Sequence, residues 1–179
     1  MQVRRVVTGH DAAGKSVVVS DGFAPRARNA VHHPGFAEAL VWSTDQTPSL
    51  PADGKDPTPA VTSFMPAPGG TRFLIVTFPP DSVVMSPIFD GAAAAAEHLQ
   101  YSPGIANRME PDNPGMHSTD TVDFVVVLDG EVWLELDDGK EVLLRKHDTV
   151  IQNGTRHAWR NKSDRGCTIA GLLVGAKRK

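Results

Sequence analysis

Short apolar runs separated by turn residues dominate the chain. Val3–Val7 and Val17–Val19 are β-branched runs that flank a Gly-containing segment, which predicts a pair of strands. Thr71–Phe78 (TRFLIVTF) predicts a buried strand that stops at two prolines, and the chain from Gly115 onward predicts a β-meander. Further strands are expected at Phe36–Trp42, Thr121–Leu128, Glu131–Leu136, Glu141–Leu144, Thr149–Gln152, Arg156–Asn161 and Thr168–Val174. Many short strands with evenly spaced turns favour an antiparallel sandwich or barrel.

One segment has the pattern of a helix. Asp90 is an N-cap residue type, and the Ala-rich stretch Gly91–Gln100 follows it. This helix is expected either to cover a site as a lid or to pack on the sheet. Asp45–Gly70 is rich in Pro, Gly, Thr and Ser, which predicts a long exposed loop. We expect a single domain, in which N-terminal strands and this loop (1–70) pack on a barrel (71–179).

Composition excludes several classes of protein. The 179 residues carry 18 Lys and Arg against 21 Asp and Glu, a formal net charge of −3, so there is no basic excess to attract nucleic acid or an anionic membrane. Cys167 is the only cysteine and cannot form an internal disulfide. The first residues lack an apolar signal segment, and no apolar run approaches the ~20 residues of a membrane span. We therefore expect a soluble cytoplasmic protein.

One motif in the N-terminal part matches a phosphate-binding pattern. Gly9–Ser16 reads GHDAAGKS, which fits G-x-x-x-x-G-K-[ST]. That loop binds phosphate only where it opens a helix, and here three β-branched residues, Val17–Val19, follow at once. We expect a turn between two strands instead.

Along the predicted strand near residue 120, one face changes from polar to apolar residues. Residues two apart in a strand share a face, which here carries, in order, His117, Thr119, Thr121, Asp123, Val125 and Val127. A second face begins at His157, after the turn Asn153-Gly154-Thr155, and continues through Trp159 and Asn161. Two imidazoles and one carboxylate that converge on a pocket would form the set that binds iron(II) and related divalent ions.

These residues resemble a known family. Met116–Gly130 (MHSTDTVDFVVVLDG) resembles the first cupin motif, and His147–Asn161 (HDTVIQNGTRHAWRN) resembles the second. His117 stands at the first His, Thr119 at the second His, Asp123 at the Glu, Gly130 at the closing Gly and His157 at the His of the second motif. The resemblance implies an all-β double-stranded β-helix, the cupin jelly-roll barrel, with an N-terminal strand extension and one short helix. It also implies a site inside the barrel mouth, and a homodimer that exchanges N-terminal strands.

Two departures from the motifs affect the expected site. Thr119 replaces a strong imidazole ligand with a neutral hydroxyl, and Asp123 is one methylene shorter than Glu. The remaining set, His117, Asp123 and His157, is our candidate for both catalysis and metal binding. The resemblance implies Fe, Mn, Ni, Co or Zn as the metal. The expected substrate pocket is lined by Thr119, Val125, Val127, Trp159 and Arg108, the last as an anchor for a substrate carboxylate.

Three functions follow as hypotheses. The first is a metal-dependent enzyme acting on a small organic molecule, as a dioxygenase, decarboxylase, lyase or dehydratase, or isomerase. The alternative is a metal-free protein that binds or senses a small ligand. A third hypothesis is acid/base catalysis by His and Asp without a metal. Fold alone does not choose between these chemistries.

Overall fold

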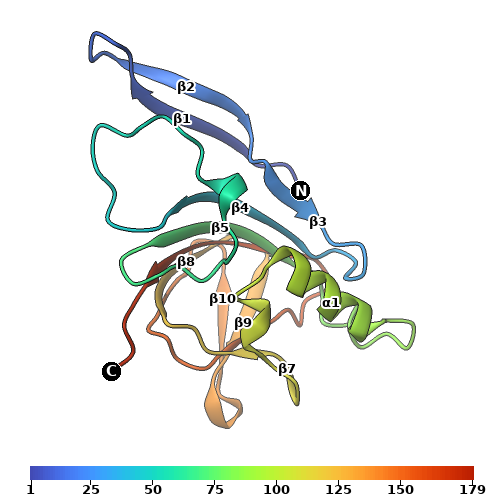
Figure 1. Cartoon of the computed structure of the whole chain (residues 1–179). Coiled ribbons are helices and arrows are strands. Elements are labelled where there is room, and N and C mark those ends of the chain that lie inside the picture. The colour runs from blue at the N-terminus through green and yellow to red at the C-terminus, as the bar shows by residue number, and fades with distance from the viewer.

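The computed structural model describes all 179 residues and consists of strands, one α-helix and three short 3₁₀-helices (Figure 1). The strands before the helix are β1 (Arg4–His10), β2 (Ser16–Phe23), β3 (Arg26–Asn29), β4 (Ala37–Thr44) and β5 (Thr71–Phe78). The helix α1 (Gly91–Tyr101) is followed by β6 (Met109–Glu110), β7 (Asn113–His117), β8 (Thr121–Asp129), β9 (Glu131–Glu135), β10 (Glu141–Arg145), β11 (Thr149–Gln152), β12 (Ala158–Arg160) and β13 (Cys167–Gly175). The 3₁₀-helices are η1 (Thr58–Ala60), η2 (Ala106–Arg108) and η3 (Asp137–Gly139).

Two antiparallel sheets enclose the core. The larger sheet has the strand order β11-β8-β13-β5-β4-β3, and the smaller has the order β10-β9-β12. Their apolar side chains form one cluster of buried residues: Val125, Val127, Val132, Leu134, Leu144, Cys167 and Ile169. The molecule is therefore the predicted double-stranded β-helix, because alternating residues of both sheets bury their side chains between them.

The N-terminal strands divide into two groups. β3 and β4 extend the larger sheet through β5, so this sheet runs across the expected division at residue 70, which stays a prediction. The hairpin β1–β2 pairs only with itself and projects from the barrel (Figure 1). The phosphate-loop pattern Gly9–Ser16 lies at the tip of this hairpin, where the Asp11 carboxylate accepts hydrogen bonds from the N–H groups of Ala13 and Lys15. The expected turn is confirmed.

The segment Asp45–Gly70 is less exposed than its composition predicts. Thr58 and Phe64 are fully buried, and Phe64 joins a second cluster with Leu40, Leu74 and Leu173. The expectation of an exposed loop is therefore wrong at these positions. Burial of the Phe64 ring in this cluster stabilises the packing of the loop on the sheet.

The helix α1 is tied to the N-terminal half of the chain. Its N-cap is Asp90, which accepts a hydrogen bond from the N–H of Ala93 at 2.9 Å, as expected. On its buried face, the Glu97 carboxylate accepts hydrogen bonds from the N–H groups of Val31 and His32 and from the Arg28 guanidinium. These contacts fix the helix against the loop after β3.

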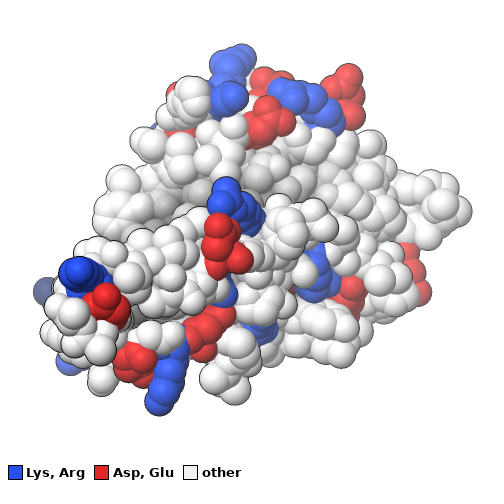
Figure 2. Space-filling model, turned by 90° about the horizontal axis from the view of Figure 1, so that it is seen from above, with Lys and Arg blue, Asp and Glu red and all other residues white.

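The face of the molecule seen in Figure 2 carries no large patch of side chains with a single charge sign. Lys and Arg side chains there alternate with Asp and Glu side chains between broad uncharged areas. Neither α1 nor any shorter helix has the length and apolar character needed to span a membrane.

Candidate functional site

The inward face predicted from the sequence persists through a break in the strands. β7 ends at His117 and β8 begins at Thr121, so the three residues between them belong to no strand. Burial nevertheless alternates with a period of two along the whole stretch. The buried positions are His117, Thr119, Thr121, Asp123, Val125 and Val127. The chain therefore keeps these side chains on the core side even where the ladder is interrupted.

The two predicted histidines meet at the end of β7. His117 and His157 form an antiparallel bridge, in which each N–H donates to the other's carbonyl at 2.9 Å. Their ring centroids lie 4.4 Å apart, and the ring planes are inclined by 47°. Both side chains are buried, with 7% and 3% of their surface exposed. Segments 40 residues apart thus bring two imidazoles together, as the sequence predicted.

Backbone carbonyls orient both rings. Nδ1 of His117 lies 2.9 Å from the carbonyl of Gly115, and Nδ1 of His157 lies 3.0 Å from the carbonyl of Thr155. A carbonyl only accepts, so the proton of each neutral ring is assigned to Nδ1. Nε2 of each ring then presents a lone pair and has no protein partner. Burial lowers the pKa of both rings, that of His157 to about 4 with a further contribution from His117, so both are neutral near pH 7.

Asp123 lies on the same inward face, but its neighbours differ from those of the two imidazoles. It sits on β8 opposite Gln152 of β11 and Leu173 of β13. Its Oδ1 atom is buried and has no hydrogen-bond partner. Burial raises the pKa of this carboxyl to about 6, against a smaller opposing effect of the Thr121 hydroxyl. Neither imidazole contributes to this shift. The Thr121 hydroxyl donates to that of Thr119 at 2.8 Å.

The donor atoms fit a divalent metal in kind but not in number. Two neutral imidazoles with free Nε2 atoms are suitable ligands. However, no group of three His, Cys, Asp or Glu side chains is arranged to hold an ion. The structure therefore does not assemble the predicted set of His117, Asp123 and His157 as a three-ligand cluster. Metal binding by this set stays a prediction.

The predicted pocket residues occupy different environments. Trp159 meets the ring of His157 edge-on at 5.7 Å and stacks on Phe78 at 6.3 Å, so it forms a wall beside the imidazole pair. Val125 and Val127 belong to the packed apolar cluster below the polar residues. The two valines therefore support the site from within the core.

Arg108 lies away from the buried face. It belongs to η2, its side chain is 45% exposed, and its Nη2 donates to Asp120 at 3.1 Å. Asp120 alternates with the inward Thr119 and Thr121, so its side chain is on the outer side of the barrel wall. The structure thus brings Arg108 to an outer depression and not to the histidines.

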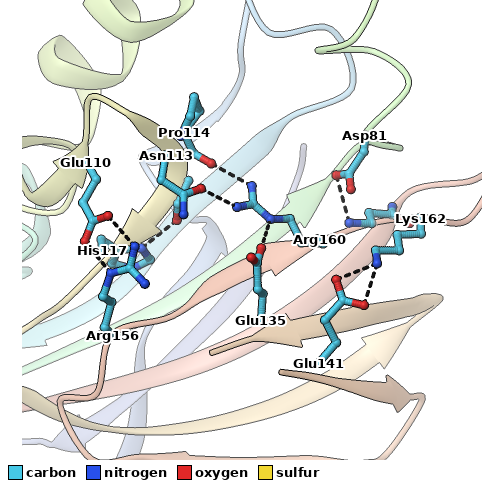
Figure 3. A network of polar contacts seen from close by, with 12 residues as sticks. Asp81, Glu110, Asn113, Pro114, His117, Glu135, Glu141, Arg156, Arg160 and Lys162 are labelled. Atoms are coloured by element: carbon cyan, nitrogen blue, oxygen red, sulfur yellow. Dashed lines mark hydrogen bonds and ion pairs between the residues drawn. The ribbon is translucent and has the colours of Figure 1, made fainter. Parts of the chain in front are cut away.

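Two arginines next to His157 are functional candidates that the sequence analysis missed (Figure 3). Arg156 binds Glu110 in a bidentate ion pair, with N–O distances of 2.7 and 2.6 Å, and the charge of Glu110 raises the pKa of His117 against the effect of burial. Arg160 donates to the carbonyl of Pro114 at 2.7 Å and also binds the side chain of Asn113 (Figure 3). Both arginines therefore fasten the β6–β7 hairpin, which carries His117, to the segment 156–160 that contains His157.

A buried glutamine holds the turn before His157. Gln152 is 2% exposed, and its amide donates to the carbonyl of Thr155 at 3.2 Å and to the hydroxyl of the same residue. The sequence analysis placed Gln152 only at the end of the expected strand Thr149–Gln152. The structure shows that its side chain supplies the hydrogen bonds that shape this turn.

No family model matches the chain. It is 25% identical to the cupin-domain-containing oxidoreductase fogC of Aspergillus ruber, over 97% of this chain and 70% of that protein. It is 24% identical to the cupin-domain-containing oxidoreductase virC of Hypocrea virens, over 95% of this chain and 72% of that protein. The chain has the cupin fold and is similar in sequence to cupin-domain proteins. In this cupin, His117 from the first motif lies beside His157 from the second motif.

Shorter alignments connect this cupin to further fungal proteins. It is 38% identical to the oryzines biosynthesis cluster protein J of Aspergillus oryzae, over 43% of this chain. It is 50% identical to the phomopsin biosynthesis cluster protein D of Diaporthe leptostromiformis, over 27% of this chain. The cupin spans 39% and 25% of the length of these two relatives. Among solved structures, a cupin superfamily protein of Desulfitobacterium hafniense is 9% identical, with a TM-score of 0.44, over 83% of this chain and 84% of that chain.

Proposed function

We propose that this cupin is an enzyme that acts on a small organic molecule held by the His117–His157 pair and Asp123 inside the barrel. One observation carries the proposal: two buried neutral imidazoles, bridged through their backbones, present free Nε2 atoms on a face that also bears a buried unpaired carboxyl oxygen. Two relatives that align over most of the chain, fogC and virC, are cupin-domain-containing oxidoreductases, which supports an enzymatic role.

The site selects its ligand by hydrogen-bonding capacity. Nε2 of each histidine and Oδ1 of Asp123 are acceptors without protein donors. Of these, Oδ1 of Asp123 is buried without any partner, which costs about 1–3 kcal/mol, so a ligand that supplies a donor there relieves that cost. The substrate class is therefore a small molecule with hydroxyl or N–H groups, with an apolar part that packs on Trp159.

The chemistry that these residues can perform is proton transfer. A neutral imidazole whose Nδ1–H is held by a carbonyl can accept a proton at Nε2 and return it later in the reaction. Asp123 carries a raised pKa, so its carboxyl binds a proton more readily than an exposed one. Groups whose surroundings move their pKa values in opposite directions can divide the acid and base roles between them.

A metal-dependent enzyme is the second candidate. The observation that favours it is the hydrogen bond from each Nδ1–H to a carbonyl, an arrangement that also orients histidines that ligate metals. His117 and His157 would hold the ion, and Asp123 would have to join them. A bound divalent ion would supply Lewis-acid chemistry.

The test combines ligand binding, turnover and metal content. A set of small hydroxy, keto and amide compounds is titrated into the protein, and the imidazole NMR signals of His117 and His157 are followed. We expect at least one donor-bearing compound to shift both signals and to be converted, as detected by mass spectrometry. Substitution His157→Gln should abolish conversion, whereas His147→Gln, in an exposed turn, should not.

Metal content distinguishes the two candidates. The protein is purified without a metal-affinity tag and assayed for elements together with His117→Ala, His157→Ala and the control His147→Ala. One metal ion per chain that is lost only in the first two variants supports the metal-dependent enzyme. Turnover that survives chelation supports the metal-free reaction. No bound compound and no metal in the wild-type protein would contradict both.

A further inference from the structure

A depression of about 400 Å³ lies on the outer side of the barrel wall, at the end that carries the histidines. Its position follows from the chain's alternation, because Asp120 points outward between the inward residues Thr119 and Thr121. The lining consists of Met65, Pro66, Pro68, Arg108, Asp120, Ala176, Lys177 and Arg178. None of these residues belongs to the acceptor set proposed for the barrel interior.

Positive charge predominates in this depression. Arg108, Lys177 and Arg178 face a single carboxylate, that of Asp120, so the lining carries a formal charge of 3 − 1 = +2. Asp120 lies between the two arginines: Nη2 of Arg108 is 3.1 Å from its Oδ2, and Nε of Arg178 is 2.6 Å from its Oδ1. This bridge holds both guanidinium groups on the same side of the depression.

The bridge leaves donors unused. A guanidinium has five N–H donors, but Arg108 donates only through Nη2, and Arg178 donates only through Nε and Nη2. The ammonium of Lys177 makes no hydrogen bond or ion pair with the protein. Unused charged donors that line the same depression as Met65, Pro66 and Pro68 are suited to an oxyanion, which accepts several hydrogen bonds at once.

The C-terminal cations are carried by an anchored backbone. The N–H of Ala176 donates to the carbonyl of Asp120 at 2.9 Å, and the N–H of Gly175 donates to that of Gly70 at 2.9 Å. Nη2 of Arg178 also donates to the carbonyls of Thr119 and Gly154, at 3.0 and 3.3 Å. Arg178 therefore spans two loops of the barrel, and its position is defined before any ligand arrives.

We propose that this depression is a binding site for a small oxyanion, a carboxylate or phosphate group, separate from the site in the barrel interior. Arg108 and Arg178 bind the anion from one side, Lys177 adds a third cation, and Asp120 competes with the ligand for the same donors. Because of this competition, removing the Asp120 charge should increase the affinity of the site for the anion.

Isothermal titration calorimetry with inorganic phosphate and with acetate tests the site, with chloride used to keep ionic strength constant. We expect saturable binding of at least one anion, and the two titrations show which oxyanion is preferred. Arg108→Gln and Lys177→Gln should each weaken binding at least threefold, and Asp120→Asn should strengthen it at least threefold. Arg4→Gln removes an exposed arginine from an Arg–Asp pair in the hairpin and should leave the affinity unchanged.

Two results would overturn the proposal. The first is the absence of saturable binding of either anion to the wild-type protein. The second is a weaker or unchanged affinity in Asp120→Asn, which would show that the four charges form only a surface ion-pair network. Lys177→Gln guards against misreading a disturbed tail, because Lys177 makes no side-chain contact that a substitution would break.

Discussion

His117 and His157 donate to each other's carbonyl through a reciprocal pair of backbone hydrogen bonds, each 2.9 Å long. The backbone, and not the imidazoles, therefore joins the two segments that carry the candidate site. Each ring is then oriented by a carbonyl two residues before it in the chain, that of Gly115 or Thr155. A side-chain substitution at either position leaves all of these backbone groups in place, so such a variant changes the charge and chemistry of the ring while the backbone bridge is retained.

The pH dependence of stability should reveal the buried state of His157. Its pKa in the folded protein is about 4, below the ordinary value of 6.5, so between these pH values the unfolded chain binds more protons. Stability must then fall as pH decreases through this range. For the metal-free protein, His157 should account for a loss of about 2 kcal/mol between pH 8 and pH 5. Urea unfolding across this range measures it.

A matched pair of variants isolates this contribution. His157→Gln should flatten the decrease in stability between pH 8 and pH 5 by about 2 kcal/mol. His10→Gln changes an exposed histidine at the end of β1 and should leave the profile as it is. Identical slopes for wild type and His157→Gln would show that the buried imidazole is protonated as easily as one in water.

Asp123 should lower the stability of the fold at high pH. Its folded pKa of about 6 lies above the ordinary 3.8, so the folded protein binds the proton more tightly and loses stability as pH rises through this range. Ionising it costs about 3 kcal/mol, so Asp123→Asn should raise the unfolding free energy by about 1–3 kcal/mol at pH 8 and little at pH 4. Asp112→Asn, at an exposed position, serves as the control. A destabilised Asp123→Asn at pH 8 would mean that the carboxylate has a favourable partner.

The strand pattern was the most predictable feature. Thr71–Phe78 matches β5 at both ends, and the buried face from His117 to Val127 follows the expected period of two. Side-chain alternation is a property of the extended backbone, so it survives where Ser118–Asp120 leave the ladder. The meeting of His117 with His157 followed from the same reasoning combined with the motif resemblance.

The relative placement of the site residues was less predictable. Periodicity assigns Asp123 to a face but does not give its distance from imidazoles on other strands. The Glu110–Arg156 ion pair joins residues 46 positions apart, and no local pattern pairs one acidic residue with one basic residue at such a separation. Arg108 lies near the first motif in sequence, yet η2 directs it to the outer depression.

Gly130, the closing glycine of the first motif, allows the cost of a steric contact to be separated from the cost of a positive φ. Gly130 has a φ of +78°, and a Cβ there would lie 2.7 Å from the carbonyl oxygen of Gly166. Gly139 also has a positive φ, +69°, but a Cβ would meet nothing within 4 Å. Gly139→Ala should cost about 1 kcal/mol of unfolding free energy, and Gly130→Ala clearly more. Equal losses in thermal or urea unfolding would show that the contact with the strand after Gly166 is easily relaxed.

The projecting hairpin leads to a prediction about assembly. Val6 and Val18 lie on one face of β1–β2, with 49% and 59% of their surface exposed, and an isolated two-stranded hairpin is marginally stable in water. The resemblance to cupins implies a homodimer through N-terminal strands, and such a contact would cover this face.

In light scattering after size exclusion, we expect a wild-type dimer, and a monomer for the double variant Val6→Ser, Val18→Ser. Ile88 lies outside the hairpin and is 91% exposed, so the control variant Ile88→Ser should remain dimeric. A wild-type monomer, or a double variant that stays dimeric, would exclude the hairpin as the interface.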